Sequence, residues 1–227
     1  MPKRWVKWIF FFCFIVSAVG CASPQFYSHV VYENPTSFVR LEFAPWAESA
    51  SPETWNAHPV SLSHRQIDKA LKGLRVREHR AAPIRWVRGE ADLEPAFQPD
   101  EIEVLSSRLL EGLESAVPQE LVTFYVSHPV NATTREVTSG GLYVTDGRLH
   151  IILSNYRAVY GIPPAGLIYD RRFPLFSLGP LGVDILYQTR DDALVQAEQE
   201  DLYDAIFGDE RSGEIVLELS ELSMMEI

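Results

Sequence analysis

The residues best suited to chemistry stand in the second half of the chain. Ser139 precedes two glycines, His150 follows, and Asp170 comes later. A hydroxyl, an imidazole and a carboxylate can serve as nucleophile, base and orienting group, although geometry and not residue type defines such a triad. Two interpretations remain open. Either the three residues form a hydrolytic site, or Gly140 and Gly141 mark a bulge or close packing and the charged residues form surface pairs.

Familiar catalytic and metal-binding motifs are missing from the sequence. It contains no G-x-S-x-G, H-E-x-x-H, G-x-x-x-x-G-K-[ST] or C-x-x-C string. A metal site needs several ligands in one shell, but no two of the six histidines are spaced three or four apart on a predicted helix. We therefore expect neither a metal nor a cofactor. The histidines are His29, His58, His64, His79, His128 and His150.

A predicted β-hairpin carries the candidate histidine. Strands over 141–145 and 148–153 flank Asp146-Gly147, a dipeptide suited to a type I′ turn. This turn sets the register, which places Tyr143 and His150 opposite each other on one face of the hairpin. If that face lines a cleft, His150 is the first residue to mutate. The other face should be buried; it carries Leu142, Val144, Leu149 and Ile151.

Two helices have clear start signals. Ser63 and Gln66 form a capping box for a short helix over residues 64–72. In the second helix, Asp100 is the predicted N-cap and Glu103 completes the box. Its apolar residues recur at helical spacing, as expected of a helix packed on a core. They are Ile102, Leu105, Leu109, Leu113 and Ala116.

The remaining pattern favours an α+β fold in a single domain, with a mainly antiparallel sheet and about three helices. Most links between the expected strands are too short for crossover helices. Asn34-Pro35 is the expected turn between the first two strands. Strands are predicted over 26–32, 37–43, 74–80, 84–87, 121–126, 183–188 and 214–219, and an acidic third helix over 192–207.

Two loops have an unusual composition. Residues 44–53 follow neither the helical nor the strand period. Trp46 in this loop and Trp55 beyond it either pin the loop to the core or act as lid or contact residues. Residues 173–180 are apolar but irregular, and we expect them to pack as a covering loop.

The first twenty residues have the layout of a secretory signal. Lys3, Arg4 and Lys7 precede an apolar run from Trp8 to Val19, and small residues follow. An α-helix needs about 20 apolar residues to cross a bilayer, and this run is shorter. The sequence therefore predicts a signal peptide over residues 1–20 that is removed.

The end of this segment, Ala18-Val19-Gly20-Cys21, resembles the lipobox of bacterial lipoproteins. The resemblance implies that Cys21 is acylated and becomes the mature N-terminus. Residues 21–25 are then the lipidated N-terminus and a short tether, and residues 26–227 the globular domain. Ala22, where the class has Asp for inner-membrane retention, points to the outer membrane and a domain facing the periplasm. The remaining cysteine, Cys13, lies in the segment to be removed, so no disulfide is expected.

The charge balance excludes one class of partner. The chain has a formal net charge of −11, and −14 without residues 1–20. This sign opposes the phosphate contacts of nucleic-acid binding and is also the wrong sign for electrostatic adhesion to anionic headgroups. Two functions remain. The chain is a non-enzymatic binding or assembly component of the envelope that meets another envelope protein or a ligand, or it is an anchored hydrolase acting on cell-wall or lipid material.

Overall fold

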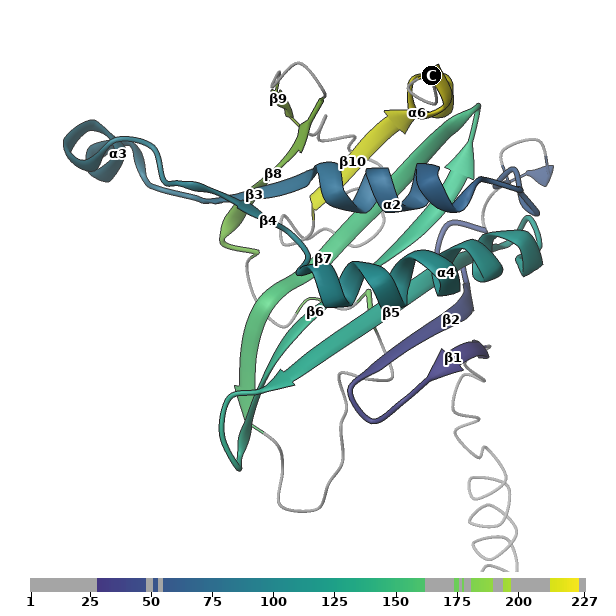
Figure 1. Ribbon diagram of the computed structural model, residues 1–227, viewed down its shortest axis with the longest axis horizontal. Coiled ribbons are helices and arrows are strands. Elements are labelled where there is room, and N and C mark those ends of the chain that lie inside the picture. Colours follow the sequence, from purple (N-terminus) through teal and green to yellow (C-terminus); the bar gives the residue numbers. More distant parts are fainter. Residues whose placement is uncertain are drawn as a thin grey trace, which may run out of the picture.

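Two antiparallel sheets and the helices packed on them make up the described part of the chain (Figure 1). The computed structural model describes residues 28–47, 51–52, 55–161, 174–175, 177, 181–189, 194–196 and 213–224. The α+β class, the mainly antiparallel sheet and the single domain predicted from the sequence are confirmed. The predicted signal peptide, Cys21 and the tether lie outside the described residues.

The larger sheet has six strands in the order β1-β2-β5-β6-β7-β10, and every neighbouring pair is antiparallel. Consecutive strands are neighbours except where β5 joins β2 and β10 joins β7. The long strands β5, β6 and β7 form its centre. The bounds are β1 (Ser28–Glu33), β2 (Ser37–Phe43), β5 (Glu120–Pro129), β6 (Thr134–Thr145), β7 (Arg148–Gly161) and β10 (Gly213–Glu218).

The smaller sheet has the order β4-β3-β8-β9 and is also antiparallel. Its strands are β3 (Leu74–Glu78), β4 (Leu93–Pro95), β8 (Val183–Gln188) and β9 (Leu194–Gln196). The described helices are α2 (His64–Gly73), α3 (Ala82–Arg88), α4 (Pro99–Ser115) and α6 (Leu219–Met224).

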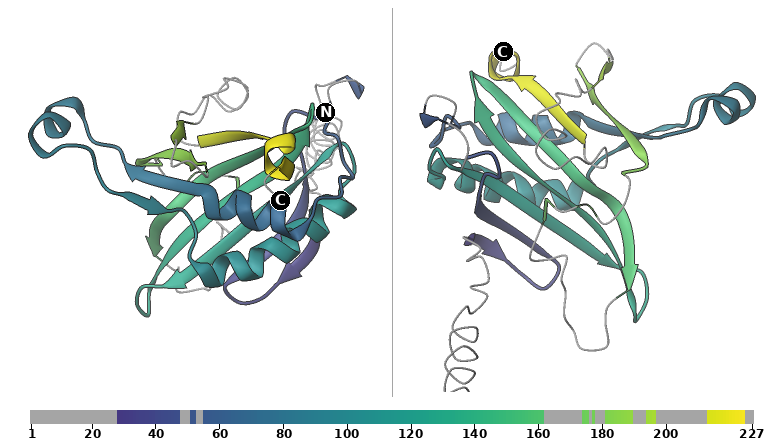
Figure 2. Two further views of the ribbon diagram at one scale, coloured as in Figure 1. Left: turned by 45° about the horizontal axis from the view of Figure 1, so that its top comes forward. Right: turned by 180° about the vertical axis from the view of Figure 1, so that it is seen from behind.

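Helices α2 and α4 lie side by side over one face of the larger sheet (Figures 1 and 2). The predicted apolar stripe of α4 is confirmed, because all five of its residues are buried in the main hydrophobic core. The capping box of α2 at Ser63 and Gln66 is also confirmed. The start of α4 was placed two residues too late: Gln98 is the N-cap, and its N–H donates to the Glu101 carboxylate at 2.6 Å. Pro99 therefore occupies the first turn, where its missing N–H costs no hydrogen bond.

The hairpin prediction is confirmed in register and in burial. Thr145 lies opposite Arg148, Tyr143 lies opposite His150, and Asp146 and Gly147 both have positive φ. The four residues predicted for the core face are buried. The turn between β1 and β2 is also as expected: the Asn34 side chain accepts hydrogen bonds from the backbone N–H groups of Thr36 and Ser37.

Three predicted elements differ from the structure. Residues 84–87 form helix α3 and not a strand, because Pro83 suits the first helical turn and a short apolar run does not by itself distinguish helix from strand. In the predicted helix 192–207, residues 194–196 form β9, whose pairing with β8 overrides helical propensity. Residues 197–207 lie outside the described part. The last strand ends at Glu218, and Leu219 begins the unpredicted helix α6.

Candidate functional site

Tyr143 and His150 form a stacked aromatic pair inside the protein. Their ring centroids are 4.4 Å apart and the ring planes differ by 18°. The cross-strand register of β6 and β7 produces this contact. His150 is only 2% exposed, so the face it shares with Tyr143 is covered and not a solvated strand surface.

Glu214 joins this pair from β10. Its Oε1 atom accepts a hydrogen bond from the Tyr143 hydroxyl at 2.7 Å and lies 2.8 Å from Nδ1 of His150. A carboxylate only accepts, so Nδ1 of His150 carries the proton and donates. This fixes the tautomer, as a carboxylate does for a catalytic histidine. Nε2 of His150 is buried and has no hydrogen-bond partner among the described residues, so the basic nitrogen of the cluster faces packed atoms and not solvent.

Apolar side chains cover the cluster of Tyr143, His150 and Glu214. The ring of Trp46 lies 4.8 Å from that of Tyr143, and Leu175 packs against the same group of side chains. The interpretation that Trp46 pins its loop to the core is confirmed. Leu175 likewise agrees with the predicted covering loop, of which residues 174, 175 and 177 are described. Trp55 is partly buried.

Ser139 has separate partners. Its hydroxyl donates to the Pro174 carbonyl at 2.7 Å and accepts from the Asn155 amide at 2.9 Å. Four positions on β6 separate Ser139 from Tyr143, about 13 Å of strand at the usual rise. The described contacts therefore do not bring Ser139 and His150 together. Asp170 lies outside the described residues.

Gly140 shows why the strand needs glycine at this point. A Cβ built on it would lie 1.9 Å from the Ile152 carbonyl oxygen. The pairing of β6 with β7 also shifts register between Ser139 and Gly140. The interpretation that the glycines mark a bulge and close packing is confirmed.

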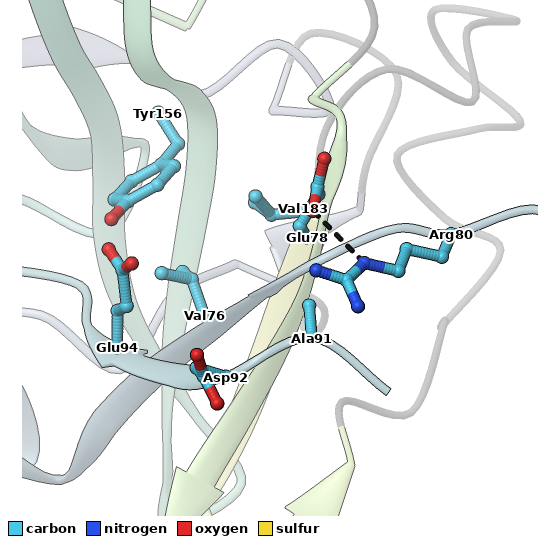
Figure 3. Close-up of a pocket in the computed structure, with 8 residues that line it drawn as sticks. All are labelled: Val76, Glu78, Arg80, Ala91, Asp92, Glu94, Tyr156 and Val183. Carbon is cyan, nitrogen blue, oxygen red and sulfur yellow. Dashed lines mark hydrogen bonds and ion pairs between the residues drawn. The ribbon is translucent and has the colours of Figure 1, made fainter. Parts of the chain in front are cut away.

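A second irregularity of β7 lies next to a polar groove. Arg157 adopts a positive φ of 45°, and its side chain approaches Glu94 at 3.6 Å. Beside it, a groove of about 190 Å³ is lined by Tyr156, the Glu78–Arg80 ion pair and further acidic residues (Figure 3). Burial raises the pKa of Tyr156. The groove is smaller than the roughly 300–1,000 Å³ of typical ligand pockets, and the described residues include no cluster of potential metal ligands.

Elsewhere in the described part of the chain, three large apolar side chains are exposed close together on α3. The segments that continue from β3 and lead back to β4 project from the smaller sheet as an arm with α3 at its end (Figures 1 and 2). Here Ile84, Trp86 and Val87 are 49%, 89% and 74% exposed. Large apolar side chains grouped in solvent mark interaction surfaces. We call residues 83–88 the α3 tip.

Two features of the candidate sites were not predicted from the sequence: the position of Glu214 and the exposed α3 tip. Glu214 lies 64 positions from His150, and no pattern in the sequence shows that β10 pairs with β7. Residues 84–87, which the sequence predicts as a strand, form most of the α3 tip. The composition of the α3 tip could have indicated a binding surface, because a tryptophan and two arginines follow Pro83 and these residue types are common at such surfaces.

In comparisons with known proteins, no protein-family model, curated protein or solved structure matches the chain. In the described part of the chain, none of the helices has the length and apolar character needed to span a bilayer.

Proposed function

We propose that this protein is an envelope lipoprotein, anchored by lipid on Cys21 in the outer membrane and facing the periplasm, whose role is to bind another envelope component. The α3 tip is its binding surface. The observation that carries this proposal is the exposure of Ile84, Trp86 and Val87 at the end of an arm. Burial of one such side chain contributes about 1.5–3 kcal/mol, so docking of the tip would be favourable.

The surroundings of the candidate catalytic residues support a binding role over hydrolysis. Ser139 and His150 each have hydrogen-bond partners of their own within packed parts of the sheet. A nucleophile and its base need to be within hydrogen-bond reach of each other. The described residues offer no such pairing for Ser139.

Site-specific photocrosslinking in intact cells tests this proposal. A photoactivatable amino acid replaces Trp86 in the full-length chain, and the same residue replaces Val159 as a control. Val159 is 62% exposed on β7, so it samples solvent without belonging to the α3 tip. Adducts with envelope components are expected from position 86 and not from position 159.

Equal labelling at the two positions contradicts the proposed binding surface. Turnover of cell-wall or lipid material that is lost in both Ser139→Ala and His150→Ala, in protein that remains folded, supports the anchored hydrolase in its place. Intact-mass measurement of the membrane-bound protein tests the lipid: an unmodified Cys21 contradicts the anchoring proposal.

A further inference from the structure

We propose that the α3 tip inserts into the interfacial layer of an anionic lipid bilayer. This inference rests on the proposed function, in which the tip is the binding surface, and names its occupant. Ile84, Trp86 and Val87 would enter the layer between headgroups and acyl chains, while Arg85 and Arg88 would contact lipid phosphates.

The shape of the tip favours a bilayer over a protein socket. The seven-residue helix α3 makes about two turns, and at about 100° per residue Val87 lies between Ile84 and Trp86 around its axis. The apolar side chains therefore cover about half of the circumference of α3 at the projecting end of the arm (Figure 1). Lipids close around such an end, and tryptophan is enriched at the depth of the headgroups.

The small apolar area of the tip also favours a bilayer over a protein as the partner. A standard protein interface takes about 800 Å² from each partner. Only Ile84, Trp86 and Val87 supply large apolar surface on the tip, and these three side chains offer less area than that. Insertion into a bilayer needs no flat complementary surface, since depth of burial contributes the binding energy.

The charges separate the tip from the rest of the molecule. Residues 83–88 contain two arginines and no acidic residue, in a chain of net charge −11, whereas Arg80 on the arm is paired with Glu78 at 3.1 Å. Arg85 lies 3.6 Å from Glu90, whereas Arg88 is exposed and has no ion-pair partner among the described residues. An anionic surface would attract the tip and repel the acidic body. The molecule would thus approach a bilayer with the tip first.

The position of the tip makes this contact distinct from the N-terminal anchor. Strand β1, where the described chain begins, and α3 lie at opposite ends of the molecule in both figures that show the whole fold (Figures 1 and 2). Stable membrane attachment commonly combines two signals. The α3 tip would supply one that is independent of acylation.

Depth-dependent fluorescence quenching tests the proposal. The full-length protein, held on vesicles by its N-terminal segment, carries Cys13→Ser and Cys21→Ser, so that an environment-sensitive fluorophore labels only Val87→Cys. A control protein carries it on Val159→Cys. Vesicles contain phosphatidylethanolamine and phosphatidylglycerol with brominated acyl chains, or phosphatidylcholine with the same chains. Quenching at position 87 should exceed that at position 159 several-fold in anionic vesicles and fall in neutral ones.

Two further variants separate the contributions of the tip. Trp86→Ser should lower quenching at position 87 roughly tenfold, since it removes the most exposed apolar group. Arg85→Gln with Arg88→Gln should remove the preference for anionic vesicles. Far-ultraviolet circular dichroism and thermal melting of each variant should match the wild type, because these side chains lie outside the core.

Any of the following results contradicts the proposal that the α3 tip inserts into a lipid bilayer. Equal quenching at positions 87 and 159, or quenching unchanged by Trp86→Ser, excludes insertion. If adducts from position 86 in cells are protein only and quenching is absent, the binding role stands and the partner is a protein. Sedimentation that depends on protein concentration and on Trp86, without vesicles, makes a second copy of the chain the occupant. Absence of both adducts and quenching removes the proposed function as well.

Discussion

His150 and Glu214 lie 64 positions apart in the chain, and Nδ1 of His150 lies 2.8 Å from Oε1 of Glu214 in the protein interior. The Tyr143 hydroxyl donates to the same oxygen. Three strands, β6, β7 and β10, are therefore joined by one carboxylate in addition to their backbone hydrogen bonds. The Glu214 side chain therefore helps to hold β10 against β7, in addition to the backbone hydrogen bonds between the two strands.

Glu214→Ala should lower the free energy of unfolding by about 3–5 kcal/mol, because it leaves the Nδ1 proton of His150 and the Tyr143 hydroxyl buried without their acceptor. Urea denaturation followed by circular dichroism measures this loss. Glu218→Ala, at the exposed end of the same strand, is the matched control and should change stability by less than about 0.5 kcal/mol. Equal effects would show that the cluster has no special weight.

Gly140→Ala should destabilise the centre of the larger sheet. The added Cβ would lie 1.9 Å from the Ile152 carbonyl oxygen, so β6 and β7 must separate locally and lose hydrogen bonds. We expect a loss of about 3 kcal/mol or more. Gly161→Ala, where the nearest atom is 3.8 Å away, should be nearly neutral. A thermal shift assay compares the two, and similar melting temperatures would contradict the close approach.

Glu42 should make the protein less stable as the pH rises. Burial raises the pKa of this carboxyl from 4.5 to about 7, against the opposing effect of Arg40. Because the folded state holds the proton more tightly, its stabilising contribution is complete below pH 4.5 and is lost as the pH rises through 7. The loss is of the order of 3 kcal/mol. Glu42→Gln should be more stable than the wild type at pH 8; a variant that is less stable there would contradict the expectation.

His58 should have the opposite pH dependence. Burial lowers its pKa from 6.5 to about 4, so the folded state favours the neutral ring. Its contribution is complete above pH 6.5 and is lost as the pH falls through 4. The windows of His58 and Glu42 overlap, so Glu42→Gln protein is the proper background. There, the free energy of unfolding should fall below pH 6.5, by up to roughly 3 kcal/mol. Adding His58→Leu should flatten that slope, and an unchanged slope would assign it to other groups.

Local signals in the sequence determined the elements whose structure depends on near neighbours. The Asp146-Gly147 turn sets its own register, so the Tyr143–His150 pair followed from residues within one hairpin. The capping box at Ser63 and the apolar stripe of α4 were likewise readable, because caps and helical periodicity act within a few residues. The antiparallel α+β class followed from short links between strands.

The tertiary structure decided everything that joins distant segments. Only the pairing of β10 with β7 brings Glu214 to His150, and only the pairing of Leu194–Gln196 with β8 turns a helical sequence into a strand. In α3, where no strand of the described residues pairs with the backbone, the local preference of Pro83 for the first helical turn decides the structure. In the first two cases, long-range hydrogen bonds and burial outweigh local propensities of at most about 1 kcal/mol per residue, and no local sequence pattern encodes them.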